Sequence, residues 1–148
     1  MYAVPPKKET QGSTARIIGS WFKERKSRDK VILATKVSGR SPLNWLRDGD
    51  KATEQSKEQI FEAVDKSLIR LGVDYIDLYQ LHWPDRPINL FGGSINYEHM
   101  DEPSIDISII LDSLNELVKS GKIRYIGLSN ETPWGTMKFL HHSDISST

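Results

Sequence analysis

The sequence predicts an α/β fold in which parallel strands alternate with helices, as they do in part of a (β/α)8 TIM barrel. Three short apolar runs have the composition of strands, and they occupy residues 31–35, 75–81 and 123–128. Segments with helical periodicity precede and separate these runs. A polar residue follows each run, and these residues, Lys36, His82 and Ser129, are 46 and 47 residues apart. Alternating elements of this length favour right-handed βαβ units and a parallel sheet.

The first helix is expected from about Ser13 to Lys26, ahead of the first strand. Its apolar stripe consists of Ala15, Ile18, Trp21 and Phe22. The strand at 31–35 is almost continuously apolar, which is typical of a central strand in a parallel sheet.

The second helix is expected between Ser56 and Gly72, ahead of the strand at 75–81. Its apolar face is formed by positions 60, 63, 64, 67, 68 and 71. Ser56 with Gln59 three residues later is the pattern of an N-terminal capping box. Gly72 predicts the C-terminal end of the helix, because glycine readily adopts the left-handed conformation found there.

The third helix is expected to begin at Ile107 and to end at Gly121, ahead of the strand at 123–128. Its apolar face is formed by positions 107, 110, 111, 114, 117 and 118. The three helices and three strands therefore follow one another in regular alternation.

A further segment is expected to start near Thr132. Residues 141–148 begin with two adjacent histidines, but two ligands without a third partner do not predict a metal site.

Composition excludes several kinds of function. The 148 residues carry 20 basic and 20 acidic side chains, and this balance gives no reason to expect nucleic acid or an anionic membrane as a partner. No apolar run approaches the roughly 18 residues that a membrane helix needs, and residues 1–6 lack the layout of a secretory signal. The absence of cysteine excludes disulfides and thiolate chemistry, and it fits a cytoplasmic protein.

The ends of the predicted strands carry the candidate site. In a (β/α)8 barrel the carboxyl ends of the strands surround one mouth, and catalytic residues come from several of them. Lys36, His82 and the pair Ser129–Asn130 would therefore point into one pocket. Two long loops, 38–55 and 84–104, also follow strands, and loops of this length usually carry function.

Each candidate also has a structural interpretation. Lys36 could be a solvated charge at the rim of the sheet, and His82 could be a hydrogen-bonded structural histidine. Ser129 and Asn130 could cap the helix that follows, since both residue types bond free amides at a helix N-terminus. Their equivalent positions on three successive strands favour the functional interpretation of the group.

Four segments together resemble the aldo-keto reductase family, in particular the branch that holds bacterial Tas-type reductases and potassium-channel beta subunits. They are TK at 35–36, LGVDYIDLY at 71–79, HWP at 82–84 and LNELVKSGKIRYIGLSN at 114–130. The resemblance covers most of residues 1 to 140 and implies one partial reductase domain there, with a helix over Trp134 to Leu140 in the family style. Residues 141–148 do not continue that helix and are expected to form a divergent tail. The family resemblance implies a (β/α)8 barrel that transfers hydride reversibly between NADPH and a small-molecule aldehyde or ketone.

The resemblance also implies roles for individual residues. Tyr2 resembles the catalytic tyrosine, Lys36 the lysine beside it, and His82 the histidine that orients the substrate carbonyl. Ser129 and Asn130 resemble the pair that bonds the nicotinamide carboxamide. A phenol has a pKa near 10, and an adjacent ammonium lowers that pKa toward the range useful for a general acid.

The chain departs from the family pattern at both ends. The family places an aspartate five residues before the tyrosine, and only Met1 precedes Tyr2 here. The first strand, the first helix, most of the second strand, strands six to eight and the phosphate-binding loops are also expected to be missing. A full barrel needs roughly 250 residues. Three strands cannot close one, and their open edges favour self-association or pairing with a complementing chain.

The functional prediction is therefore an NADPH-dependent reductase by lineage that is inactive on its own. The alternative is a non-enzymatic remnant, or a binding or regulatory module that resembles the channel beta subunits. A third interpretation, an unrelated barrel enzyme that uses Lys36 and His82 differently, is disfavoured by the four-part match.

Overall fold

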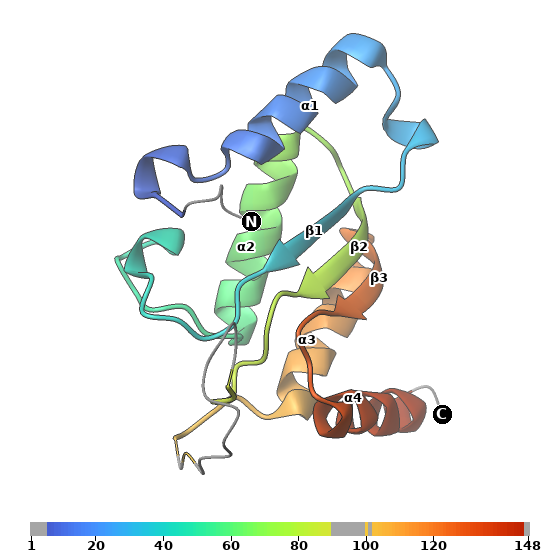
Figure 1. Ribbon diagram of the computed structural model, residues 1–148. Coiled ribbons are helices and arrows are strands. Elements are labelled where there is room, and N and C mark those ends of the chain that lie inside the picture. Colours follow the sequence, from blue (N-terminus) through green and yellow to red (C-terminus); the bar gives the residue numbers. More distant parts are fainter. Residues whose placement is uncertain (1–5, 90–99, 101, 147–148) are drawn as a thin grey trace.

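The computed structural model describes residues 6–89, 100 and 102–146 (Figure 1). Its centre is a parallel three-stranded sheet in the order β1-β2-β3. The strands are β1 (Ala34–Val37), β2 (Ile76–Leu81) and β3 (Ile123–Leu128). The helices are α1 (Ser13–Arg25), α2 (Lys57–Leu71), α3 (Ile107–Lys119) and α4 (Pro133–Ser146), with short 3-10 turns at Lys8–Thr10, Arg28–Lys30 and Asn44–Leu46. The predicted α/β class is confirmed. An open sheet of three parallel strands is consistent with the predicted partial (β/α)8 barrel.

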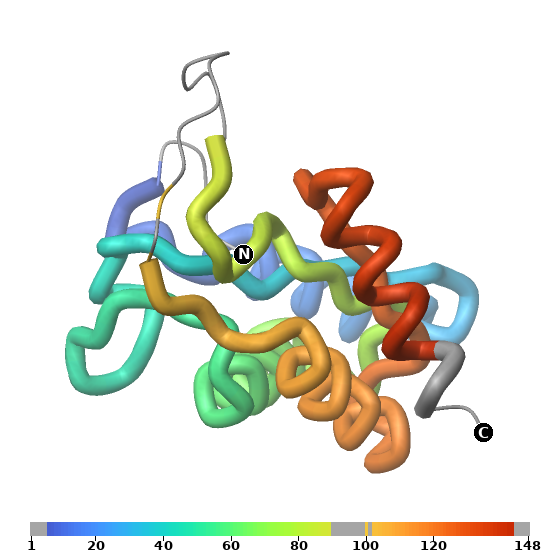
Figure 2. The backbone as a smooth tube through the Cα atoms, turned by 90° about the horizontal axis from the view of Figure 1, so that it is seen from below, coloured from blue at the N-terminus to red at the C-terminus, as the bar shows by residue number. Residues whose placement is uncertain are grey.

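The helices cover one face of the sheet. In Figure 1, α2 and α3 lie behind the strands, α1 lies against α2, and α4 lies beyond the carboxyl end of β3. Figure 2 gives the same arrangement from below. One core joins the sheet to these helices, and its fully buried members include Val37, Ile60, Val64, Ile76, Tyr79, Leu114, Leu117 and Ile123. Among the described residues no helix is long and apolar enough to cross a bilayer.

The first strand differs from its prediction. β1 begins at Ala34, three residues later than expected, and Lys36 lies within it instead of at its end. The reason is a contact distant in sequence, because the Leu33 N–H donates to the buried Asp77 carboxylate at 2.9 Å. Arg28 donates to the Val31 carbonyl at 2.8 Å. β1 also forms an edge of the described sheet, although its composition is typical of a central strand.

The predicted capping box of α2 is wrong. Ser56 occupies the N-cap position, but its side chain makes no capping bond. The Gln59 amide turns to the preceding loop, where it accepts from the Glu54 N–H at 3.1 Å and donates to the Ala52 carbonyl at 3.0 Å. The C-terminal prediction is confirmed, since Gly72 adopts a left-handed conformation with φ of 63° and donates to the last turn.

The last helix is longer than predicted. α4 runs to Ser146, six residues past Leu140. It starts from Thr132, whose hydroxyl accepts from the Gly135 N–H at 3.1 Å and whose carbonyl accepts from Thr136. A domain boundary at residue 140 stays a prediction, but the helix does not end there.

The second face of the sheet holds the predicted site residues. Lys36, Gln80 and Gly127 are in register across the three strands, so they share a face. Their neighbours Val37 and Leu81 are in register on the other face and are buried against the helices. The face of Lys36 is open in comparison, and Tyr125 on β3 is 70% exposed there. We call this surface the open face.

Candidate active site

Two of the predicted residues from distant parts of the chain meet directly. The Lys36 ammonium donates to the Ser129 hydroxyl at 3.1 Å, although 93 residues separate them. The parallel register explains the contact, because it brings the carboxyl ends of β1 and β3 to one edge on either side of β2. His82 continues the ladder at that edge, with its N–H donating to the Val37 carbonyl at 2.8 Å.

Asn130 connects the ends of β2 and β3. Its φ is 54°, a left-handed conformation that asparagine tolerates better than most residues. This turn directs the side-chain amide back over the sheet, where Nδ2 donates to the His82 carbonyl at 2.7 Å. The same nitrogen donates to the Ser129 hydroxyl at 3.1 Å. Lys36, Ser129, Asn130 and the His82 carbonyl therefore form one hydrogen-bonded cluster. That the four side chains share one substrate pocket stays a prediction.

The alternative role of Ser129 and Asn130 as helix caps is not what the structure shows. Thr132 caps α4 instead. Glu131, which stands between Asn130 and Thr132 in the sequence, forms an ion pair with Arg86 from the loop after β2. Arg86 also donates to the Thr132 hydroxyl at 2.9 Å. These bonds fix the start of α4 independently of the cluster, and so they leave the side chains of Ser129 and Asn130 on the open face.

His82 is held in a partly buried position next to Lys36. Burial lowers the pKa of its imidazole, and the positive charge of Lys36 lowers that pKa further. The ring is therefore neutral at pH 7, the state in which one nitrogen donates and the other accepts. It lies 4.6 Å from the Trp83 ring, centroid to centroid, and the Trp83 indole N–H donates to the Arg40 carbonyl at 2.9 Å.

The loops around this cluster converge on Asp85, which sequence reasoning missed. Its side chain is 1% exposed and accepts from three donors, two in the loop after β1 and one later in the loop that holds Asp85 itself. They are the Gln55 N–H at 2.8 Å, the Arg40 guanidinium at 2.9 Å and the Ile105 N–H at 2.8 Å. In the sequence Asp85 is one more aspartate in a long polar loop, and no local pattern marks it as buried.

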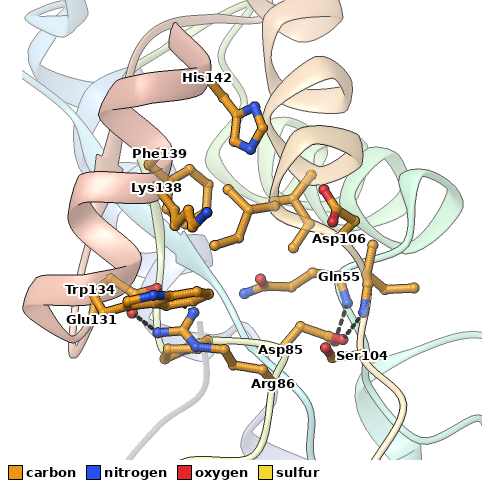
Figure 3. A pocket seen from close by; sticks show the side chains of 14 residues that line it. Gln55, Asp85, Arg86, Ser104, Asp106, Glu131, Trp134, Lys138, Phe139 and His142 are labelled. Carbon is orange, nitrogen blue, oxygen red and sulfur yellow. Dashed lines mark hydrogen bonds and ion pairs between the residues drawn. The ribbon is translucent and has the colours of Figure 1, made fainter.

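Two cavities lie near the carboxyl edge of the sheet. The smaller, of about 30 Å³, is lined by Lys36 and His82 together with Val37, Arg47, Lys66, Arg70 and others. The larger, of about 200 Å³, lies on the helix side between the loop after β2, α3 and α4 (Figure 3). The predicted cluster is therefore at an open surface and not inside the larger cavity.

One predicted catalytic residue cannot be placed. Tyr2 lies outside the described residues, so its distance from Lys36 stays a prediction. The described ranges also contain no group of three or more histidines and carboxylates able to hold a metal ion.

Comparison with known proteins identifies the relatives of this chain. The sequence model of the Aldo/keto reductase family matches residues 2–147. Protein tas of Escherichia coli K12 is 46% identical over 149 residues, which cover 97% of this chain and 41% of that protein. An aldo-keto reductase of Babesia bovis is 52% identical over 118 residues, which cover 74% of this chain and 41% of that protein.

The solved structures to which this chain is similar are also aldo-keto reductases. An aldo-keto reductase from Bacillus halodurans in its holo form superposes with a TM-score of 0.61 and 35% identity, over 88% of this chain and 37% of that one. An aldo-keto reductase from Klebsiella pneumoniae, crystallised with NADPH, gives a TM-score of 0.61 at 25% identity, over 88% and 34%. The chain thus spans about two fifths of the length of the curated relatives it matches.

Proposed function

The chain belongs to the aldo-keto reductase family, and from this premise we propose that it supplies the carbonyl-facing and nicotinamide-facing residues of an NADPH-dependent reductase of small aldehydes or ketones. The observation that carries the proposal is the bond from Lys36 to Ser129, at 3.1 Å. This bond places Lys36, which is expected to assist proton transfer, beside Ser129, which is expected to contact the cofactor.

The hydrogen bonds of Ser129 and Asn130 leave the groups that a nicotinamide carboxamide needs. The Ser129 oxygen accepts from both Lys36 and Asn130, so its hydroxyl hydrogen can point outward and donate. The Asn130 nitrogen is engaged with the His82 carbonyl, and Oδ1 has no partner among the described residues. One outward donor and one outward acceptor match the carbonyl and NH₂ groups of a carboxamide.

Lys36 and His82 would act on the substrate side. An ammonium has three donors, so Lys36 can bond Ser129 and still stabilise the phenolate form of Tyr2. This lowers the pKa of the phenol and makes it a better proton donor to the carbonyl oxygen. His82, neutral at pH 7, would donate a hydrogen bond to the same oxygen and fix its position. When bound, NADPH supplies the hydride.

The matched relatives are longer than this chain, which covers 41% of protein tas and of the Babesia bovis reductase. We infer that the reaction also needs the parts of the barrel formed by the remainder of their length. We propose that those parts cover the open face, either from the same polypeptide or from a complementing chain, with self-association through the edges of β1 and β3 as the competing outcome. We place the reaction in the cytoplasm on the cysteine-free composition alone.

The test compares residues 1–148 alone with a chimera in which they replace the matching segment of the Escherichia coli relative. The assay follows NADPH absorbance with an aldehyde that the intact relative reduces. We expect turnover by the chimera and none by residues 1–148 alone, because in our proposal the phosphate-binding part of the site comes from the segments that only the chimera adds.

The Tyr2→Phe variant is the matched control for both samples. It should abolish turnover by the chimera, since only the phenol oxygen is removed. Turnover by residues 1–148 alone that disappears in Tyr2→Phe would show that these residues already form a complete site.

A further inference from the structure

The larger cavity lies outside the cluster described above and has no role in the proposed reaction. It is an open-sided cavity bordered by Gln55, the loop after β2, the N-terminal end of α3 and one side of α4 (Figure 3). Its volume of about 200 Å³ is somewhat larger than the ~150 Å³ of a protein cavity that holds one benzene molecule. It can therefore accept a ligand with a single ring and a small substituent.

Gln55, which lines the cavity, has a buried side-chain oxygen that accepts no hydrogen bond from the described residues. Gln55 is 1% exposed, and its Nε2 donates to the Trp83 carbonyl at 2.8 Å. Its Oε1 is buried and has no hydrogen-bond partner among the described residues. In Figure 3 the Gln55 amide reaches toward the middle of the cavity. A buried carbonyl oxygen without a donor is unfavourable, so a ligand that donates to it is favoured.

The carboxylates of the lining each have donors already. Glu131 is paired with Arg86, and Asp106 accepts from the N–H and the hydroxyl of Ser108. Asp85 has its three donors. Because these carboxylates already accept from protein donors, they do not favour a cationic ligand, and we take a neutral ligand as the match.

The rest of the lining suits a flat apolar body. Ile110 and Phe139 are 2% and 6% exposed and form the apolar wall on α3 and α4. The Trp134 ring closes another side, with the Arg86 guanidinium 5.1 Å and the Lys138 ammonium 5.6 Å from its centroid. These cations position an aromatic ring at the mouth of the cavity.

We propose that this cavity binds a neutral, single-ring molecule that carries a hydrogen-bond donor, of the phenol or benzamide class. Its hydroxyl or N–H donates to Gln55 Oε1, and its ring packs between Phe139 and Trp134. A water molecule could also bond Gln55, but it would leave the apolar walls of the cavity without contacts.

The test titrates the 148-residue chain with phenol and with benzene, which has the same ring without the donor. Binding is followed by two-dimensional NMR at the Gln55 side-chain amide and the Trp134 indole N–H. We expect phenol to bind about tenfold more tightly than benzene, the effect of one net hydrogen bond. Equal affinities, changes at other residues only, or occupancy by water with no phenol binding would each overturn the proposal.

Two variants locate the site. Gln55→Met keeps a side chain of similar length without the acceptor, and it should reduce phenol affinity to that of benzene. Because Gln55 also bonds Trp83, this variant could fail to fold, and Ile110→Phe then provides the second measurement. It fills the cavity from the α3 wall and should abolish binding of both probes. Unchanged phenol binding in Ile110→Phe would exclude this cavity.

Discussion

Replacing Lys36 by methionine in the chimera lowers kcat for aldehyde reduction by about 10²–10⁴-fold, the usual contribution of a positioned proton-transfer group. Methionine is close to lysine in length but carries no charge. It therefore removes the ammonium that bonds Ser129 at 3.1 Å and that would lower the pKa of the Tyr2 phenol. Steady-state kinetics with saturating NADPH measures the loss.

Lys119→Met is the matched control for this prediction. Lys119 ends α3 on the exposed helix side of the fold, and the same change there removes one charge from the chain without reaching the cluster. It should leave kcat unchanged. If Lys36→Met retained kcat within about threefold of the parent chimera, well short of the usual contribution, Lys36 would have no part in proton transfer.

Replacing Asp85 by alanine destabilises the fold by about 3–5 kcal/mol, the usual effect of removing one partner from a buried ion pair. The carboxylate is 1% exposed and joins the loop after β1, at Arg40 and Gln55, to Ile105 in the loop after β2. Without it, the buried Gln55 N–H, the partly buried Ile105 N–H and part of a guanidinium lose their acceptor. Urea denaturation followed by circular dichroism measures the free energy of unfolding.

Asp65→Ala provides the comparison for Asp85. Asp65 accepts from Lys122 at 2.6 Å, but both side chains are substantially exposed, at 49% and 37%. A surface pair of this kind contributes about 0–1 kcal/mol. Equal losses for Asp85→Ala and Asp65→Ala would show that the two loops do not depend on the buried carboxylate.

The helices and strands could be predicted wherever local pattern controls them. The ends of α2 and α3 follow from Gly72 and Gly121, which adopt positive φ of 63° and 76°. The start of β1 could not be predicted, because it depends on Asp77, which lies more than 40 residues away from Leu33. The same applies to Gln59, whose amide bonds a loop that periodicity does not describe.

Some features of the site could likewise be predicted from the sequence, and others could not. The meeting of Lys36 with Ser129 could be predicted, because parallel strands bring their carboxyl ends to one edge whatever the loops do. Asp85 and Gln55 could not, since their importance comes from burial by segments distant in the sequence. Sequence periodicity identifies faces of elements, and it does not identify which polar side chain of a loop those elements will enclose.

The most direct test of the central claim compares two ligands on the chimera. One is NADPH and the other is its adenine-nucleotide portion, which lacks the nicotinamide ring. The Ser129→Ala, Asn130→Ala double variant should weaken NADPH binding by about tenfold or more while leaving the Kd of the ringless ligand unchanged, because only the carboxamide contacts are removed. An equal loss for both ligands, or for neither, would contradict the assignment of these residues to the nicotinamide.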